Sequence, residues 1–214
     1  MMKNIIFDMD GVLMDSWDVM NDAFVKIKFR GKTIDEVIAN HKKYITTKPY
    51  HSKGEPLSQE RYKYVIDVLD QCFEIIKSDP RYKPFYGFLD ELKNIKDARF
   101  AIVSSNGEKH IRNFIKRTDI LFTHALSFED NPSKEAKVEK ITKDWGVTEQ
   151  DIIYVTDTIA DIFELQSFIP KSNLVGCSWG YCGYDLLSKE LPSNQILLEF
   201  SDIHKVLETK QFKF

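Results

Sequence analysis

The chain has few cysteines, glycines and prolines. Its 214 residues include 3 cysteines, 9 glycines and 7 prolines, with 43% hydrophobic and 29% charged residues. This balance excludes a fibrous or disordered chain. The cysteines form no CxxC pair, so they suggest neither a zinc knuckle nor a disulfide framework, and we expect them to be small buried residues. They are Cys72, Cys177 and Cys182.

The sequence also lacks a membrane segment and an excess of basic charge. Residues 1–4 lead into three apolar residues and then an aspartate, which neither a secretory leader nor a membrane span tolerates. We therefore expect a cytoplasmic protein with no membrane partner. A net charge of -3 and a pI near 6.0 provide no basic stripe, so nucleic acid is not an expected partner.

Short apolar runs predict buried strands, and helical patterns lie between several of them. EKHIRNFIKR follows the second run and AKVEKITKDWGV precedes the fourth, both with apolar residues three and four positions apart. This alternation predicts an α/β fold with a Rossmann-like, doubly wound parallel sheet covered by helices on both faces. The predicted strands are 4–7, 100–103, 122–125, 152–155 and 173–177.

Residues 17–81 interrupt this alternation with helical patterns and no convincing strand. Ser58 is a plausible N-cap, and Thr33 with Glu36 forms a capping-box signature. We predict a small α-helical cap domain here, inserted after the first strand.

The remaining residues, 1–16 and 82–214, are predicted to form the α/β core domain, because a chain of this length supports one core and at most a small satellite. Two segments, 14–18 and 79–87, connect the predicted cap to this core. Both are candidate hinges, and the second is rich in Pro and Gly.

The first strand ends in FDMDGVLMDS, which places Asp8 and Asp10 where the chain leaves the sheet. Ligands bind at this carboxyl edge in open α/β sheets. Carboxylates at i and i+2 point the same way, and their repulsion favours a cation or a shared proton between them. In the alternative interpretation, the two aspartates only cap a turn at Gly11.

FDMDGVLMDS resembles the opening signature of the haloacid dehalogenase superfamily, whose phosphatase members carry Asp-x-Asp after the first strand. The resemblance extends over nearly the whole chain and is to phosphoglycolate-phosphatase-like hydrolases. It implies that Asp8 is the nucleophile that forms an aspartyl phosphate and that Asp10 is the general acid and then the general base. Dehalogenases of this superfamily lack the second aspartate, so dehalogenation is disfavoured.

The second strand ends in FAIVSSNG, where Ser104, Ser105 and Asn106 lead into a helix. Hydroxyls and backbone N–H groups at a helix start can form a phosphate seat. By resemblance, Ser104 is the phosphate-binding Ser or Thr of the family, and the two residues after it contribute amide contacts. Taken alone, SSNG is more often a plain N-cap turn.

Three lysines, Lys134, Lys137 and Lys140, precede the fourth strand in SKEAKVEKI. Lys134 stands 23 positions before Asp157, the spacing that family members show between the site lysine and the first metal-binding aspartate. The resemblance therefore implies that Lys134 is catalytic and binds phosphate, with Lys137 as the reserve candidate. Without it, these lysines are surface residues of an amphipathic helix.

The fourth strand ends in IIYVTDTIAD, which places Asp157 and Asp161 four residues apart on a starting helical turn. Oxygen ligands with little nitrogen or sulfur nearby favour Mg²⁺. The resemblance implies a Mg²⁺ site formed by Asp8, Asp10 and Asp157, completed by Asp161 either through water or by orienting Lys134. The family usually has Gly in place of Thr156, which leaves this loop conformation open. Alternatively, the acids only cap a helix.

In relatives with this insertion the cap selects the leaving group. Candidate contacts are Trp17, Tyr44, Lys48, His51 and Lys53, although solvated surface positions explain them at least as well. The loop after the last predicted strand, residues 179–181, resembles one beside the site in such relatives, or is ordinary packing. The histidines show no ligand spacing and are expected to be structural: His41, His51, His110, His124 and His204.

The sequence therefore predicts a Mg²⁺-dependent phosphatase that hydrolyses a small phosphorylated metabolite through an aspartyl phosphate, as a monomer or a homodimer. Two alternatives stay open. One is a sugar-phosphate mutase of the same superfamily, similar to β-phosphoglucomutase, which returns the phosphoryl group to a sugar. The other is a non-catalytic regulatory protein that has kept the phosphate seat.

Overall fold

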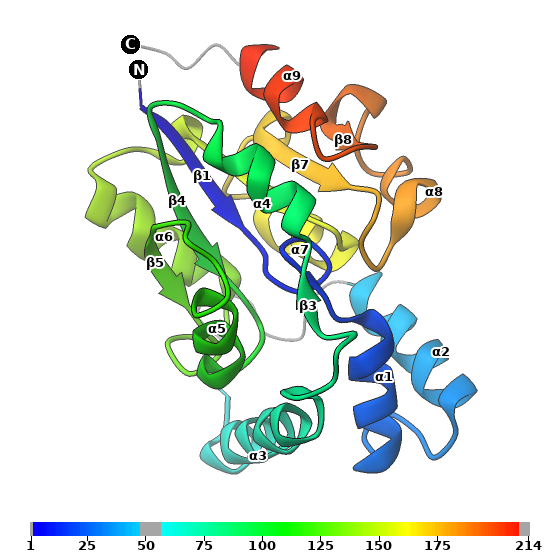
Figure 1. Ribbon diagram of the computed structural model, residues 1–214. Helices are drawn as coiled ribbons and strands as arrows, with labels where there is room; N and C mark the ends of the chain where they lie inside the picture. Colours follow the sequence, from blue (N-terminus) through cyan, green and yellow to red (C-terminus); the bar gives the residue numbers. More distant parts are fainter. Residues whose placement is uncertain (1, 48–56, 210–214) are drawn as a thin grey trace.

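The computed structural model describes residues 2–47 and 57–209, and a six-stranded parallel sheet forms its centre (Figure 1). The strand order is β5-β4-β1-β6-β7-β8. From β1 the chain winds outward through β4 and β5, and it then returns to the other side of β1 and winds outward through β6, β7 and β8, so the winding changes direction beside β1. Ligands bind beside such a switch point. The strands are β1 (Lys3–Phe7), β4 (Ala98–Val103), β5 (Phe122–Leu126), β6 (Ile152–Thr156), β7 (Leu174–Cys177) and β8 (Ile196–Leu197).

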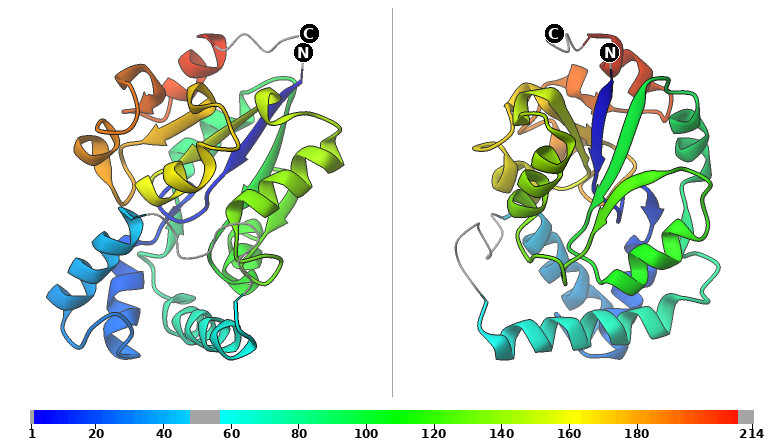
Figure 2. Two further views of the ribbon diagram at one scale, coloured as in Figure 1. Left: turned by 180° about the vertical axis from the view of Figure 1, so that it is seen from behind. Right: turned by 90° about the vertical axis from the view of Figure 1, so that its left-hand side faces the viewer.

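Helices cover both faces of the sheet, as Figure 2 shows. Alternate side chains of β1 point to opposite faces of the sheet. Phe7 belongs to a buried cluster with α4 (Tyr86–Lys93), α5 (Glu108–Ile115) and α9 (Asp202–Thr209), and Ile6 to a second cluster with α6 (Lys134–Trp145), α7 (Ile159–Leu165) and α8 (Gly183–Leu187). Both side chains are fully buried, each contributing about 1.5–3 kcal/mol of transfer free energy. The predicted α/β fold is confirmed.

A short 3-10 turn directly precedes each of the strands β6, β7 and β8. These turns are Glu149–Asp151, Lys171–Asn173 and Ser193–Gln195, in that order. The edge strand β8 was not predicted, because a two-residue strand is too short to show a periodicity.

Three helices lie beyond the carboxyl end of the sheet: α1 (Trp17–Lys26), α2 (Ile34–Ile45) and α3 (Gln59–Ile76) (Figure 1). The predicted caps are confirmed. Thr33 and Glu36 form the capping box of α2, and the Ser58 hydroxyl accepts a hydrogen bond from the Arg61 N–H at the start of α3. The division into a cap domain at 17–81 and a core stays a prediction.

The two candidate hinges lie side by side. β2 (Met14–Asp15) and β3 (Lys83–Pro84) pair as a small antiparallel ribbon between the sheet and the three helices. This ribbon was not predicted, because each of its strands has only two residues. It ties the chain segment that enters α1 to the segment that returns from α3.

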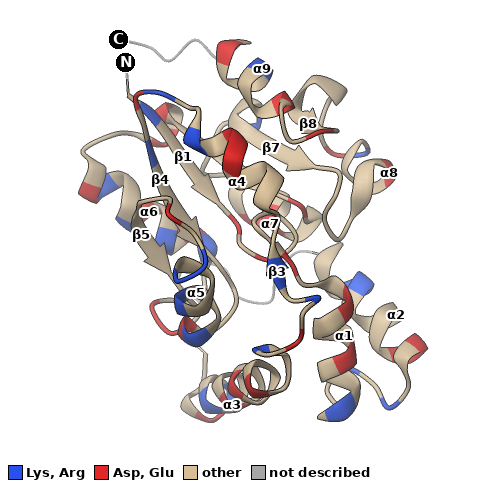
Figure 3. Ribbon diagram, in the orientation of Figure 1, with Lys and Arg blue, Asp and Glu red and all other residues tan. Residues whose placement is uncertain are grey.

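The three cysteines are free thiols and are buried, as expected. Within the described ranges, no helix combines the length and the apolar composition that crossing a bilayer requires. Lys and Arg residues are interspersed with Asp and Glu residues along the outer helices (Figure 3).

Candidate active site

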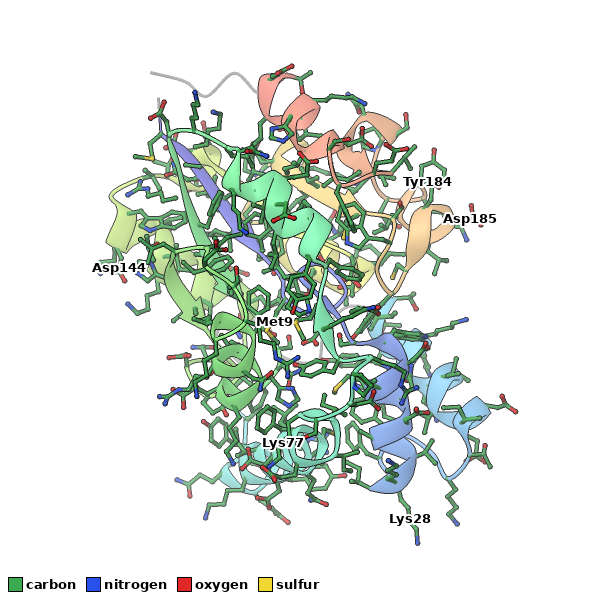
Figure 4. All side chains as sticks on the ribbon, in the orientation of Figure 1. Met9, Lys28, Lys77, Asp144, Tyr184 and Asp185 are labelled. Carbon is green, nitrogen blue, oxygen red and sulfur yellow. The ribbon has the colours of Figure 1, made fainter. Side chains whose placement is uncertain are left out.

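Asp8 leaves the sheet at the carboxyl end of β1, next to Met9, which Figure 4 labels at the centre of the molecule. The Asp8 N–H still donates to the Val155 carbonyl (2.9 Å), so the sheet ladder fixes its backbone. Its Oδ1 accepts from the Met9 N–H (2.8 Å), and its Oδ2 lies 2.8 Å from the Lys134 Nζ. The carboxylate is buried and held at both oxygens.

Lys134 joins two buried carboxylates. Its Nζ lies 2.8 Å from Asp8 Oδ2 and 2.7 Å from Asp161 Oδ2. Burial opposes the charge, but Asp161 and Asp8 raise the pKa of Lys134 well above its ordinary value. Burial raises the pKa of Asp8 to about 7, against the opposing effect of Lys134. The lysine is therefore a fixed cation beside a carboxylate that titrates near neutral pH.

Lys137, the reserve candidate, contacts neither aspartate. Its Nζ donates to the Ser104 carbonyl (2.6 Å) and the Ser127 carbonyl (3.1 Å) beneath the loop that follows β4. Burial and the Lys134 charge lower the pKa of Lys137 to about 7. A neutral amine has two N–H donors, which match these two carbonyls. Lys140 is exposed and pairs with Asp144.

The buried Lys137 predicts a pH dependence of stability. Its pKa of about 7 in the folded protein lies below the ordinary 10.5, so the unfolded chain binds more protons between these values. The free energy of unfolding should therefore rise with pH across this window, by up to about 1.4 kcal/mol per pH unit. Urea denaturation at several pH values should show this rise in the wild type and in Lys140→Met, and a shallower one in Lys137→Met. Equal slopes for all three would contradict it.

The segment after β4 faces Asp10. The Asn106 side-chain amide donates to Asp10 Oδ2 (2.9 Å), and the Asn106 N–H donates to the Ser104 hydroxyl oxygen (3.0 Å). Ser104 and Asn106 are buried, whereas Ser105 is exposed, and all three line the same cavity as Asp8. Asp10 Oδ1 is buried and has no hydrogen-bond partner among the described residues.

Asp157 lies fully buried beside two close glycines. Its Oδ2 accepts from the Tyr181 N–H (2.7 Å), while its Oδ1 has no hydrogen-bond partner in the described part of the chain. A Cβ on Gly11, which has φ +75, would lie 1.9 Å from Asp157 Oδ2, and one on Gly180 would lie 2.2 Å from Asp157 Cβ. Only glycine fits at either position. The 179–181 loop therefore lies beside the site.

The donor groups at this edge fit a divalent cation. Burial, and then the Asp8 charge, raise the pKa of Asp157 well above its ordinary value, a cost that a bound cation would relieve. Within residues 2–47 and 57–209, no three His, Cys, Asp or Glu side chains form a group that could hold a metal by themselves. Mg²⁺ needs no such cage, since it binds through one or two carboxylates, waters and substrate phosphate.

Thr156 occupies the position where the family usually has Gly, and it is fully buried without a positive φ. Its hydroxyl donates to Asp161 Oδ2 (2.8 Å) and accepts from the Thr158 N–H (3.1 Å). The Tyr154 hydroxyl also lies 3.3 Å from Asp161 Oδ2. Asp161 Oδ2 thus accepts hydrogen bonds from Lys134 and from two hydroxyls. The hydroxyls orient the Asp161 carboxylate, and the carboxylate in turn orients the lysine.

Glu164 is a contributor that the sequence did not reveal. Its Oε1 accepts from the Ser133 hydroxyl (3.0 Å) and the Lys134 N–H (2.6 Å), at the start of α6. A carboxylate at a helix N-terminus stabilises the unpaired N–H groups there. Glu164 therefore fixes the backbone that carries the lysine. Its only sequence signal is its place one helical turn after Asp161.

A cavity of about 610 Å³ opens above these residues, between the sheet edge and helices α1, α2 and α3. Tyr44 lines it. Trp17 instead stacks on His41 (4.7 Å between ring centroids) and contacts Tyr181, which also lines the cavity. The other three candidate contacts, Lys48, His51 and Lys53, lie outside the described residues.

Each of the four described histidines forms a hydrogen bond or an ion pair with a neighbouring group, as expected for a structural role. His41 is buried against the Asn21 side chain, and His110 lies between the Tyr82 hydroxyl and the Leu69 carbonyl. The remaining two form pairs with acids: His124 with Asp144 and His204 with Glu91.

The family model for haloacid dehalogenase-like hydrolases matches residues 5–164, a range that contains Asp8, Asp10, Ser104, Lys134, Asp157 and Asp161. No curated protein matches the sequence.

Several solved structures share the fold. A predicted phosphoglycolate phosphatase from Haemophilus somnus is 19% identical, with a TM-score of 0.64, covering 96% of this chain and 98% of that one. A predicted phosphatase from Clostridium acetobutylicum is 17% identical, with a TM-score of 0.65 and coverages of 97% and 99%. A hydrolase from Pseudomonas syringae is 16% identical, with a TM-score of 0.71 and coverages of 98% and 100%. At these identities the likeness is one of fold.

Proposed function

Because the chain belongs to the haloacid dehalogenase-like hydrolases, we propose that it is a Mg²⁺-dependent phosphatase that hydrolyses a small phosphorylated metabolite through an aspartyl phosphate. The observation that supports this most is the contact of Lys134 with the buried Asp8, at the floor of a cavity at the sheet edge. A buried carboxylate held by one cation, with open space before it, suits attack on a phosphate monoester.

Asp8 acts as the nucleophile. Its carboxylate attacks phosphorus, the ester oxygen leaves, and water then cleaves the bond between phosphorus and the Asp8 oxygen. The Met9 N–H and Lys134 hold the carboxylate in one orientation, which reduces the entropy lost on reaching the transition state. Lys134 also favours the ionised form that the attack requires.

Asp10 acts as the general acid and then the general base. The Asn106 amide donates to Asp10 Oδ2, which fixes the orientation of this carboxyl group. Asp10 gives a proton to the leaving oxygen and later takes one from the attacking water.

The phosphoryl oxygens gain stabilisation from Ser104 and Lys134. Lys137 holds the Ser104 carbonyl from below, and Glu164 holds the Lys134 backbone, so both groups are positioned before substrate binds. Asp8, the Asp10 carbonyl and Asp157 would hold Mg²⁺, which when bound offsets the repulsion between nucleophile and phosphate.

Phosphate release from phenyl phosphate tests the proposal. Release should require Mg²⁺: EDTA should abolish it, and added Mg²⁺ should restore it. Because two similar structures carry the names of a phosphoglycolate phosphatase and a phosphatase, 2-phosphoglycolate belongs in the substrate panel.

Three results would contradict it. Release that survives EDTA argues against the metal, a strict need for a bisphosphate primer indicates a mutase, and no release from any monoester indicates a binding protein.

A further inference from the structure

The cavity carries opposite charges at its two ends. On the sheet side it is lined by acids around Lys134, and on the side of the inserted helices by three basic residues and no described acid. The acids are Asp8, Asp10, Asp161 and Glu164, and the basic residues are Lys28, Arg30 and Arg61. The acidic end has the site described above to account for it, whereas the basic end has no role in that chemistry.

Arg30 is the innermost of these cations. It is half-buried, and its guanidinium carbon lies 4.0 Å from the ring centroid of Tyr44 and 5.2 Å from that of Phe29. Its Nε is buried and has no hydrogen-bond partner among the described residues. Burial lowers the pKa of Arg30 and the Tyr44 side chain raises it, so Tyr44 compensates part of the charge, while Nε is left as a buried donor without an acceptor in the described part of the chain.

Arg61 adds a second cation, whose guanidinium carbon lies 5.3 Å from the ring centroid of Tyr64. Arg61 lies in the first turn of α3, where the helix dipole disfavours a positive charge. Arg61 and Arg30 line the same cavity, and after burial the Arg61 charge further lowers the pKa of Arg30. No described carboxylate forms an ion pair with either of them.

The backbone that presents Arg30 is strained. Lys28 and Arg30 have φ values of 56 and 66, the left-handed region that non-glycine residues rarely adopt. The Asn40 side chain donates to the Arg30 carbonyl (2.5 Å), which holds this conformation. Such strain persists where surrounding contacts enforce it, and it is common at ligand clamps. Lys28, whose side chain extends outward (Figure 4), and Arg61 are exposed, whereas Arg30 is half-buried, so Arg30 is the basic residue that lies deepest in the cavity lining.

We propose that Arg30, with Arg61 at the cavity mouth, binds a second anionic group carried by the leaving group of the substrate. This inference rests on the proposed phosphatase function, since the first phosphate is the one at Asp8. The anion is a carboxylate or a second phosphate, both of which a guanidinium can bind through two parallel hydrogen bonds. Met20, Phe24 and Val68 line the space as well, so the part of the substrate between the two anions is uncharged.

A matched substrate series tests this proposal by turnover. The series comprises phosphate monoesters of ω-hydroxy acids, diol bisphosphates and diol monophosphates, each with chains of two to six carbons. The wild type should have a higher kcat/KM for either the ω-hydroxy acid esters or the diol bisphosphates than for the neutral diol monophosphate of equal length. The preferred class of substrate identifies the anion. In Arg30→Met, the ratio of anionic to neutral kcat/KM should fall about ten- to a hundredfold, mainly through KM.

Arg112→Met is the matched control, because the Arg112 guanidinium pairs with Glu108 on the outside of α5 and does not line the cavity. This variant should keep the wild-type ratio. Equal kcat/KM for anionic and neutral substrates in the wild type, or an unchanged ratio of anionic to neutral kcat/KM in Arg30→Met, would overturn the anion site.

Calorimetry separates this inference from the phosphatase itself. In the presence of Mg²⁺, 4-phosphonobutanoate should bind the wild type more tightly than butylphosphonate does, and Arg30→Met should lose that difference. Neither compound is hydrolysed, so the measurement holds even if no monoester is turned over. Equal affinities for the wild type would overturn the anion site, whereas absent turnover counts only against the phosphatase.

Discussion

Asp8→Asn is expected to slow phosphate release by more than about 10⁴-fold, because an amide oxygen cannot form the aspartyl phosphate on which turnover depends. The loss should appear in kcat, measured as phosphate released under saturating substrate. Asp144→Asn is the control: Asp144 lies on the outer side of the molecule (Figure 4), in contact with Lys140 and His124. It should leave the rate unchanged.

The fold should survive this change. Asp161 raises the pKa of Asp8, and Asp8 raises that of Asp157, so the three buried acids repel one another when ionised. An amide at position 8 removes part of this repulsion, and Lys134 keeps its contact with Asp161. The thermal unfolding midpoint without metal should therefore equal or exceed that of the wild type. A variant that stays folded and retains the wild-type rate would end the proposed mechanism.

The sheet could be predicted from the sequence because each central strand is buried on both faces. Such strands read as continuous apolar runs, and all five predicted runs form strands, including the partly buried edge strand β5, whose run contains Thr123 and His124. The ribbon of β2 and β3 has no comparable signal, since Met14 pairs with Pro84 across 70 positions of sequence. A pairing of two residues depends on where the helices between them return the chain.

Candidate residues of the site could be identified where short motifs follow predicted strands. Asp8, Asp10 and Asp157 lie at strand ends, and parallel strands bring their carboxyl ends to one edge. The spacing to Asp157 singled out Lys134 over Lys137, and in the structure only Lys134 contacts Asp8.

Other contributors were missed because their roles arise from contacts between distant segments. Glu164 supports α6 from a position 30 residues later in the chain, and Gly180 is required by the approach of Asp157. Arg30 belongs to an ordinary-looking basic segment, and only its buried Nε and its left-handed backbone distinguish it. None of these features has a local pattern in the sequence.

Lys134→Met is expected to impair both stability and turnover. The Lys134 side chain is 3% exposed and its ammonium lies between Asp8 and Asp161, so its removal leaves two buried carboxylates facing each other. Breaking a buried pair in this way costs roughly 3–5 kcal/mol, to be measured by urea denaturation at pH 7 without metal. Loss of a charge aimed at the phosphoryl oxygens should lower kcat by about 10²–10³-fold.

The stability loss in Lys134→Met should depend on pH in a direction that identifies its cause. Lys134 lowers the pKa of Asp8, so the variant holds Asp8 protonated at higher pH than the wild type does. Above pH 7 wild-type Asp8, with a pKa of about 7, is ionised, whereas the folded variant still holds the proton, so the deficit in unfolding free energy should shrink as pH falls toward 7 and change little below it. Lys140→Met, on the exposed side of the same helix, should show neither effect. A deficit that stays constant with pH would mean that lost packing, rather than unpaired carboxylates, destabilises the variant.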